Sequence, residues 1–410
     1  MARQMKDSGI EWIGEIPANW NIVRIGTQYT ERKTKVSDTE YPPLSVTMKG
    51  IVPQLATAAK TDAHDDRKLV CKGDFAINSR SDRRGSCGIS AYDGSVSLIN
   101  TILCPRDEMN PEYYDWLFHS TMFSDEFYKW GHGIVDDLWT TNWQDMKRIS
   151  IPEPSLEEQA RIAKHLSKVC YEIDAIIEKT KATIEEYKRL KQSIITEAVT
   201  KGIRGNRPMK DSGIEWIGVI PVDWEVKKLK FTSEFKQNKY STNDGELRYI
   251  GLENIVAWNG HYIETDSEYD REQSLICEPG DILFGKLRPY LAKVYINTEK
   301  QCCSGEFCVI SIKEQITKYM WYQLISHGFI FMVDRSTYGT KMPRANAEYI
   351  KNISVSIPPI EEQKEIVDYL DKKCVEMDTL IEKKTALLEE MESYKKSVIY
   401  EYVTGKKEVL

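Results

Sequence analysis

The sequence contains no hydrophobic run that approaches the ~20 residues needed to cross a membrane. Its first ten residues, MARQMKDSGI, are polar and lack the apolar stretch of a secretory signal peptide. These two absences argue against an integral membrane protein and against a secreted one. We therefore expect a cytoplasmic protein with no membrane partner.

Motifs for metal binding and catalysis are also missing. The nine cysteines form no CxxC pair, and the six histidines are scattered away from the cysteines at 302, 303 and 308, so reduced thiols are expected rather than a metal site. No phosphate-binding GxxxxGK followed by Ser or Thr occurs. The double prolines in YPPL (41–44) and IPPI (357–360) lack the flanking residues with which an amino-methyltransferase holds a flipped base. We predict no catalytic residue, no metal site and no cofactor on this chain.

The composition favours a soluble chain of several units. With 41% hydrophobic and 29% charged residues, 410 residues can form packed cores in two to four structural units. The formal net charge of −7 argues against simple nonspecific adhesion to nucleic acid. Local basic clusters can still set the field at a contact surface, and such clusters occur at 80–84 and 286–293.

An internal repeat is the most informative feature that is present. MKDSGIEWIGEIPANW (5–20) returns as MKDSGIEWIGVIPVDW (209–224), a displacement of 209 − 5 = 204 residues. The tripeptide EEQ (157–159) recurs at the same displacement (361–363). A period this long indicates two tandem structural units rather than a solenoid of short repeats.

The segments between the repeats, about 21–148 and 225–352, are equal in length but little alike. This difference suggests two related domains that read two different things and are held in a common frame. Their patterns indicate mixed α and β structure. Strands are predicted at 74–77, 88–92, 96–103, 280–296 and 306–312, and helices at 111–130 and 319–333.

A long helix is predicted to follow each of these segments. ISIPEPS (149–155) is a short extended piece, and Ser155 with Glu158 forms a capping-box signature for a helix start. Apolar residues then recur at threes and fours with no proline or glycine until Gly202, and the second copy continues likewise to Gly405. The predicted seam contains Ile162, Leu166, Val169, Ile173, Ile176, Thr180, Ile184, Tyr187, Leu190 and Ile194 in the first helix, and Ile366, Leu370, Met377, Leu380, Leu388, Met391, Tyr394 and Val398 in the second.

Each helix alone would expose its apolar stripe, so we expect the two helices to pack on each other. If the two half-molecules are related by a pseudo-twofold axis, the helices lie antiparallel. A helix that folds onto its own domain, and a partner helix from another chain, are the alternatives. The repeated WIGxIPxxW is interpreted as a packing clasp, because indoles bury well against a rigid proline turn.

Candidate DNA-contacting residues lie in two pairs of loops. NSRSDRRGS (78–86) places three arginines between predicted strands, and GKLRPY (285–290) corresponds to it by order. Arginine can bind guanine O6 and N7 with two hydrogen bonds, and Ser or Asn can adapt to other base edges or phosphates; a solvated turn is the alternative. A polar piece also recurs before a helix, as DDLWTTNW (136–143) and GTKMPRANAEY (339–349). The candidates are Asn78, Arg80, Arg83, Arg84, Thr141 and Asn142 in the first copy, and Lys286, Arg288, Tyr290, Lys293, Lys341, Arg344 and Asn346 in the second.

These motifs together resemble the specificity subunit of a type I restriction-modification system. The most specific elements are the repeated KDSGIEWIG, the segment GDILFGKLRPYL, and the joins ISIPEPSLEEQ and VSIPPIEEQ that lead into the long helices. The resemblance implies an α+β fold in which two mixed α/β target recognition domains are separated by two long helices that form an antiparallel coiled coil. The implied domains are 1–150 (first recognition domain, clasp 5–20), 151–204 (central helix), 205–356 (second recognition domain, clasp 209–224) and 357–410 (C-terminal helix).

The resemblance also implies a function. Each recognition domain would read one half of a bipartite, asymmetric site in double-stranded DNA. The helices would set the unread spacer and dock two methyltransferase subunits, which carry S-adenosylmethionine and flip the adenine. Restriction subunits would use ATP and Mg²⁺. The stretch FAINSRSDRRGS (75–86) departs from the sequence that is commoner in this family. A nonenzymatic two-headed scaffold for proteins, and the separate recognition subunit of a fused methyltransferase-nuclease, are the alternatives.

Overall fold

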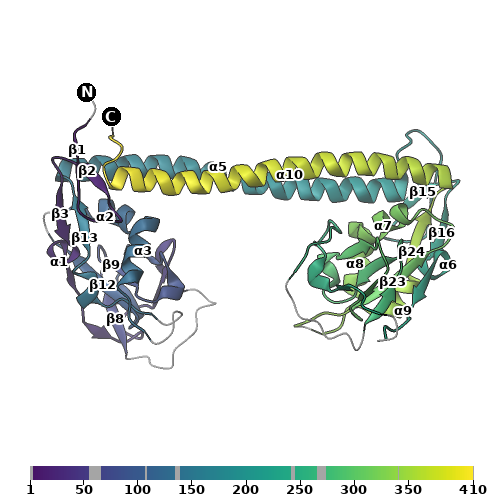
Figure 1. The fold of residues 1–410 in the computed structure, drawn as a ribbon, viewed down its shortest axis with the longest axis horizontal. Coiled ribbons are helices and arrows are strands. Elements are labelled where there is room, and N and C mark those ends of the chain that lie inside the picture. The colour runs from purple at the N-terminus through teal and green to yellow at the C-terminus, as the bar shows by residue number, and fades with distance from the viewer. Residues whose placement is uncertain are drawn as a thin grey trace. The chain divides into compact units, whose positions relative to one another are not determined.

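The computed structural model describes residues 3–54, 66–106, 109–133, 139–241, 245–265, 274–339 and 341–409. The chain divides into two compact units (Figure 1). Unit 1 comprises Met1–Lys181 and Ala386–Leu410, and unit 2 comprises Ala182–Thr385. Both divisions fall inside long helices, so each unit contains one mixed α and β head together with part of each long helix.

The two predicted long helices are present. Helix α5 spans Leu156–Lys201 (46 residues) and helix α10 spans Ile360–Val403 (44 residues), so α5 is roughly 70 Å long at 1.5 Å per residue. At the start of α5 the backbone N–H of Glu158 donates to the Ser155 hydroxyl at 3.3 Å. Gly202 follows α5 with φ +77, a left-handed conformation that glycine adopts without strain. None of the helices in the described ranges is long and apolar enough to cross a membrane.

The helices run antiparallel where they meet within each unit. In unit 1 the ring centroids of His165 and Tyr402 lie 4.5 Å apart, and Lys395 donates to Asp174 at 2.7 Å. Residue numbers therefore rise along α5 while they fall along α10. In unit 2 the same order is given by the pairs Lys191–Asp378 and Arg204–Glu365, each at 2.7 Å. The antiparallel prediction is confirmed.

The seam differs in part from the predicted stripe. Ile176 and Leu190 are each 45% exposed, Leu380 is 38% exposed and Tyr394 is 49% exposed, so these four side chains do not belong to it. The apolar pattern offered neighbouring residues on either side of the seam, and a shift of one residue turns a helical side chain by about 100°. The predicted seam residues that are buried or half-buried are Ile162, Leu166, Val169, Ile173, Thr180, Ile184, Tyr187, Ile194, Ile366, Leu370, Met377, Leu388, Met391 and Val398, and Cys170 and Ile177 join them.

The described residues in the head of unit 1 form short strands and four α-helices of one to three turns. The strands are β1 (Met5–Asp7), β2 (Glu15–Pro17), β3 (Asn21–Arg24), β4 (Tyr29–Glu31), β5 (Lys35–Val36), β6 (Leu44–Thr47), β7 (Gly50–Pro53), β8 (Arg67–Val70), β9 (Phe75–Asn78), β10 (Cys87–Ile89), β11 (Gly94–Ser97), β12 (Asn100–Pro105) and β13 (Ser150–Glu153), and the helices are α1 (Ile25–Gln28, a single turn after β3), α2 (Pro111–Phe118), α3 (Thr121–Lys129) and α4 (Trp143–Met146).

The head of unit 2 repeats most of this order. Its strands are β14 (Met209–Asp211), β15 (Val219–Pro221), β16 (Glu225–Lys228), β17 (Ser233–Lys236), β18 (Tyr249–Ile250), β19 (Leu275–Cys277), β20 (Ile282–Gly285), β21 (Val294–Ile296), β22 (Gln301–Cys303), β23 (Phe307–Ile312) and β24 (Ser354–Ile357), and its helices are α6 (Leu229–Thr232), α7 (Thr317–Ile325), α8 (His327–Arg335) and α9 (Ala347–Asn352).

Matching sheets show that the two heads share one fold. The four-stranded sheets have the orders β10-β9-β12-β4 and β21-β20-β23-β17, so equivalent strands occupy equivalent places. In both heads the strand before the first short helix pairs antiparallel with the strand that leads into the long helix, as β3 with β13 and β16 with β24. Two helices, α2 and α3 or α7 and α8, supply buried aromatic and aliphatic side chains to the core of each unit.

Two predicted helices are each broken once. The helix expected at 111–130 is α2 and α3, and the one expected at 319–333 is α7 and α8. The break falls at Ser120 and at Ser326, whose hydroxyls accept from the backbone N–H of Phe123 and Phe329 at 3.3 and 3.4 Å. A serine cap inside an apolar pattern therefore ended one helix and began the next. The strand predicted at 280–296 is likewise interrupted by the turn Pro289–Leu291.

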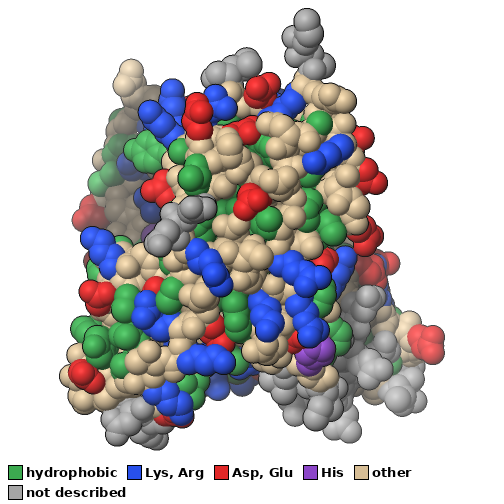
Figure 2. Space-filling view, turned by 90° about the vertical axis from the view of Figure 1, so that its left-hand side faces the viewer, with side chains coloured by type: hydrophobic (Ala, Val, Ile, Leu, Met, Phe, Trp, Pro, Cys, Tyr) green, Lys and Arg blue, Asp and Glu red, His purple; other side chains and the backbone are tan. Residues whose placement is uncertain are grey.

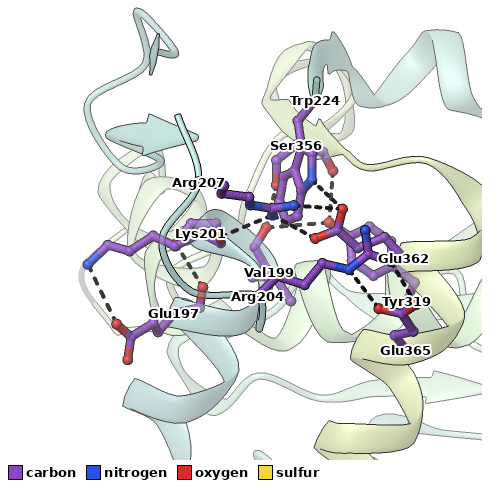
Figure 3. A network of polar contacts seen from close by, with 11 residues as sticks. Glu197, Val199, Lys201, Arg204, Arg207, Trp224, Tyr319, Ser356, Glu362 and Glu365 are labelled. Carbon is purple, nitrogen blue, oxygen red and sulfur yellow. Dashed lines mark hydrogen bonds and ion pairs between the residues drawn. The ribbon is translucent and has the colours of Figure 1, made fainter. Parts of the chain in front are cut away.

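The repeated clasp holds the head, the helix start and the preceding chain together. Trp20 and Trp224 are completely buried, as expected of a packing role. The Trp224 indole N–H donates to Glu362 at 3.1 Å, and Arg207 donates to the same carboxylate at 2.9 Å (Figure 3). In unit 1 the Trp20 indole donates to Glu158 at 2.8 Å, and Arg3 pairs with that glutamate at 2.5 Å.

A tyrosine ties each head to the end of a long helix. The Tyr113 hydroxyl donates to the Val403 carbonyl at 2.8 Å in unit 1. Its counterpart Tyr319 donates to the carbonyls of Ser356 at 3.1 Å and Val199 at 3.4 Å in unit 2 (Figure 3). The carbonyls of Val403 and Val199 lie in the last turn of α10 and α5, where they have no partner within the helix.

Leu166→Asp is predicted to destabilise the protein by more than about 3 kcal/mol, because Leu166 is fully buried and the new carboxylate would have no partner. Tyr171→Asp on the same helix is the control, since Tyr171 is 76% exposed. Thermal unfolding of both variants measures the difference. Equal melting temperatures for the two variants would contradict the seam described above.

Arg207→Ala is predicted to cost about 3 kcal/mol of stability, because it leaves the Glu362 carboxylate, 1% exposed, buried without its cation. Arg204 lies on the same linker and pairs with Glu365 at 2.7 Å, but both side chains are about half exposed. Arg204→Ala should therefore cost less than about 1 kcal/mol. Denaturant unfolding that gave the two variants similar losses would refute a special role for the buried pair.

Candidate nucleic-acid interface

In unit 1 the two predicted contact segments lie against each other. Arg80 and Thr140 form an antiparallel bridge. On either side of it, Ser81 N–H donates to the Trp139 carbonyl at 2.9 Å and Thr141 N–H donates to the Ser79 carbonyl at 3.0 Å. The loop after β9 and the segment before α4 therefore form one surface. Residues 136–138 of the predicted segment lie outside the described residues.

The three loop arginines keep much of their surface exposed while each pairs with an acid. The side chains of Arg83 and Arg84 are 68% and 58% exposed. Arg84 pairs with Asp125 at 2.9 Å and lies 5.3 Å from the centre of the Tyr128 ring. Arg80 pairs with Asp82 at 3.0 Å, and Arg83 lies 3.7 Å from the same carboxylate. Exposed pairs of this kind are weak, so the arginines can exchange these acids for a ligand's phosphates or base edges.

Three other candidates in unit 1 have local structural roles. The Asn78 side chain accepts from the Arg80 N–H at 3.1 Å and so shapes the loop. Thr141 is fully buried, and its hydroxyl donates to the Phe127 carbonyl at 2.8 Å, which leaves it no surface for a ligand. Asn142 is exposed and caps α4 by accepting from the Gln144 N–H at 2.7 Å.

Unit 2 builds the same surface from different residues. Leu287 and Arg344 form an antiparallel bridge at the place of Arg80 and Thr140. The Arg288 N–H donates to the Pro343 carbonyl at 2.7 Å, and Ala345 N–H donates to the Lys286 carbonyl at 2.9 Å. The loop after β20 is thereby joined to the segment before α9.

The loop of unit 2 holds an arginine in a left-handed backbone conformation. Arg288 has φ +49 and Ala292 has φ +45, on either side of the turn Pro289–Leu291. This conformation costs a non-glycine residue roughly 1–2 kcal/mol, and such strain is concentrated at functional sites. Arg288 is exposed, and no ion pair of its side chain is recorded within the described residues. Tyr290, 44% exposed, lies in the same turn.

The remaining candidates of unit 2 divide between exposed and anchored side chains. Lys341 is exposed, and Arg344, 42% exposed, pairs with Glu306 at 3.1 Å. Asn346 is exposed and caps α9 by accepting from the Glu348 N–H at 2.8 Å. Lys286 and Lys293 each donate to a backbone carbonyl at 2.7 Å, from Gly305 and Leu252 respectively. Burial lowers the pKa of Lys293, as expected of a cation removed from water.

Sequence reasoning missed three residues of this surface. Tyr338 is 62% exposed and bridges to Arg344, and Met342 is 58% exposed beside it. Glu306 carries the carboxylate that orients Arg344. Nothing in the sequence pattern distinguishes these side chains from ordinary turn residues, because their importance comes from the bridge between two segments about 55 residues apart.

Basic side chains also gather away from the loops. Figure 2 looks onto the left-hand side of Figure 1 and shows Lys and Arg side chains gathered in the lower half of that face. Arg24 at the end of β3 and Arg148 before β13 are both exposed in unit 1. Arg106 follows β12 and approaches the Gly26 carbonyl at 3.5 Å. The net charge of −7 therefore coexists with locally basic surface.

The thiols and potential metal ligands among the described residues form no second candidate site. All nine cysteines are free thiols. Within the described ranges, no group of three or more His, Cys, Asp or Glu side chains is arranged to hold a metal ion.

The fold and its loops define a two-headed protein in which related domains, built on a repeated frame, carry different exposed side chains on equivalent surfaces. The family described as "Type I restriction modification DNA specificity domain" matches residues 20–186 and again 221–390. The chain therefore belongs to this family and contains two of its domains in tandem.

Curated relatives support this assignment over nearly the whole chain. The type I restriction enzyme MjaVIII specificity subunit of Methanocaldococcus jannaschii is 26% identical, covering 95% of this chain and 93% of the relative. The EcoDI specificity subunit of Escherichia coli is 24% identical, covering 90% of this chain and 84% of the relative.

Solved structures show the same fold. A chain from a study of complex assembly and conformational transition of a type I restriction-modification system matches with a TM-score of 0.72 at 14% identity, covering 96% of this chain and 99% of that one. The HsdS subunit from Thermoanaerobacter tengcongensis matches with a TM-score of 0.52 at 16% identity, covering 96% and 98%. The predicted fold class and family are thus confirmed.

Arg288→Gly and Arg288→Ala should both remove the exposed guanidinium, but with different effects on folding. Glycine adopts φ +49 without the strain that alanine incurs, so the glycine variant should be more stable than the alanine variant by about 1 kcal/mol. Thermal unfolding of the two variants measures this difference. An alanine variant at least as stable as the glycine variant would show that the loop relaxes out of the left-handed conformation.

Proposed function

We propose that this chain is the noncatalytic subunit that gives a type I restriction-modification complex its DNA sequence specificity. Each head reads one half of a bipartite, asymmetric site in double-stranded DNA. This proposal rests on one observation: both heads build the same surface from two bridged segments, but with different side chains on it. The surface carries Arg80, Arg83 and Arg84 in unit 1, and it carries Arg288 and Arg344 in unit 2. Equivalent surfaces with different chemistry are what the reading of two different half-sites requires.

The long helices have the features of a spacer and a docking surface. Helices α5 and α10 each continue without a break from one unit into the other. We propose that their length sets the unread spacer between the half-sites. Large side chains remain exposed on them, including Tyr171 (76%) and Val375 (65%). These side chains, with the exposed Ile176 and Leu190, would be covered by two methyltransferase subunits.

The chemistry belongs to the partners. The methyltransferase subunits would bind S-adenosylmethionine and flip the target adenine, and restriction subunits would use ATP and Mg²⁺. This chain contributes recognition, so no cofactor is assigned to it. We propose that it acts in the cytoplasm, on the DNA that such a complex would modify.

Assembled complexes test the division of labour between the heads. The site is first identified by mapping methylated adenines in DNA modified by the complex. Arg84→Ala is then expected to weaken discrimination at one half-site only, by about 1–3 kcal/mol per lost base contact, and Arg288→Gly at the other half-site only. Gel shifts on duplexes with each half-site permuted in turn measure the loss.

Arg161→Ala is the matched control, because Arg161 lies on α5 with its side chain 55% exposed and pairs only weakly with Glu157 at 3.9 Å. It should leave both half-sites unaffected. Loss of binding by the same factor on every duplex would assign Arg84 or Arg288 to phosphates instead. A wild-type complex with no preference among the duplexes would refute the proposed function and would favour a scaffold for proteins.

A further inference from the structure

A hollow of about 510 Å³ lies in unit 2 beside the loop that carries Arg288. It is open to solvent between the end of β17, the start of β23 and helix α9. Four lysines line it, and no Asp or Glu belongs to its described lining. Lys286 connects the hollow to the recognition loop, since it stands two residues before Arg288. The lysines are Lys236, Lys239, Lys286 and Lys351.

Contacts orient three of these four lysines. Lys236 donates to both oxygens of Asp281 at 2.8 Å, and Lys286 donates to the Gly305 carbonyl at 2.7 Å. Lys351 pairs with Glu348 at 2.6 Å and lies 5.4 Å from the centre of the Phe235 ring.

Lys239 is exposed, and no ion pair of its side chain is recorded in the part of the chain that the structure describes. Two carboxylates, Asp281 and Glu348, thus accompany four cations. The hollow keeps an excess of positive charge, and its walls are already arranged before any ligand enters.

A buried thiol, Cys308, lies near several of these cations. Cys308 lines the hollow and is 5% exposed. Burial raises the pKa of Cys308 to about 11, while Lys286, Lys351 and Arg344 act in the opposite direction on the same sulfur. These three positive groups therefore lie close enough to Cys308 to act on it, with Glu348 acting in the other direction, and a protonated thiol does not compete for them as an anion.

The internal repeat retains most of this charge. Arg32, Lys35 and Lys147 of unit 1 stand 204 residues before Lys236, Lys239 and Lys351, the displacement of the frame itself. Arg32 also pairs with Asp74 at 2.6 Å, as Lys236 pairs with Asp281. By the bridges Arg80–Thr140 and Leu287–Arg344, the residue equivalent to Lys286 is Ser79.

The repeat keeps positive charge at the same three places in both heads. Positions 32 and 236 each hold a cation beside a buried aspartate, while positions 35 and 239 and positions 147 and 351 are lysine in both copies. Lysine and arginine can each serve as a positive charge for a phosphate. A ligand common to both heads, recognised by charge and not by sequence, fits the phosphates of a DNA backbone.

We propose that the hollow is a phosphate cradle that holds the DNA backbone next to the half-site read by the Arg288 loop. This inference rests on the proposed function and deepens it. The cradle positions the duplex so that Arg288 and Arg344 meet base edges, and it contributes affinity without contributing specificity. Lys286 belongs to the second head alone and strengthens the cradle there.

Salt titration of the assembled complex tests the cradle. Lys239→Gln and Lys351→Gln are each expected to lower affinity by the same factor on cognate and permuted duplexes. Each should also reduce the slope of log K against log salt by about 0.9, the value for one lost phosphate contact. Lys364→Gln is the control that should change neither quantity. The side chain of Lys364 is exposed on α10 and pairs with Glu361 at 3.0 Å.

A duplex with single neutral methylphosphonates gives the second measurement. A methylphosphonate at one position near the second half-site should weaken DNA binding by the wild-type complex. The same methylphosphonate should not weaken binding by the Lys239→Gln complex any further. Lys239 is exposed, so its replacement leaves the fold intact. Unchanged salt slopes in both lysine variants would overturn the cradle while the half-site preference of the wild type still supports the proposed function. Loss on the cognate duplex alone would also overturn it, because it would make the lysines base contacts.

Discussion

A buried glutamate at the start of each long helix is the contact on which the arrangement of a unit depends. Glu158 and Glu362 each accept an indole N–H from the clasp and pair with an arginine from the chain before it. A carboxylate removed from water is tolerated only when it is fully paired. The clasp, the preceding chain and the helix start therefore fit together in one way. Since β13 and β24 lead directly into the helices, each head is also oriented against its helix.

The contact between arginine, tryptophan and glutamate at the start of each long helix is the same in both units, whereas the side chains of the loops differ. Arg3, near the beginning of the chain, takes in unit 1 the place that Arg207 of the linker takes in unit 2. The cation lies 5.3 Å from the tryptophan ring in both units. Such a frame favours the same residue types in both copies, because the tryptophan, the arginine and the glutamate bond to one another. The recognition loops need only the backbone bridge, so their side chains are free to differ.

The sequence predicted those parts of the fold that depend on local pattern and repetition. The long helices follow from an uninterrupted spacing of apolar residues, and the paired heads follow from the 204-residue displacement. Boundaries inside the heads were less predictable. Ser120 and Ser326 end one helix and cap the next, which an apolar pattern alone does not reveal. Ile176 was assigned to the seam in place of Ile177, because both fit a spacing of three or four.

The candidate site shows a similar limit. The arginines at 80–84 and at 288 and 344 stand out in the sequence by type, and their exposure leaves them available for contact. Thr141 and Lys293 matched the same pattern, but burial and hydrogen bonds to backbone carbonyls engage them within the head. Which polar residue of a loop faces solvent is decided by the bridge between two distant segments. A spacing rule along one segment does not contain that information.

The charge arrangement of the loops favours specificity over general affinity. Arg80, Arg83, Arg84 and Arg344 all face an acid in the free protein, and the net charge of the chain is −7. A random duplex must displace these acids and gains only phosphate contacts in return. On the proposed function, a cognate half-site would replace each exposed pair with base-edge hydrogen bonds of comparable or greater strength. Displacing the acids adds the same cost on every duplex, so only a duplex that supplies base-edge contacts would offset it, and weak binding without such contacts would become weaker still.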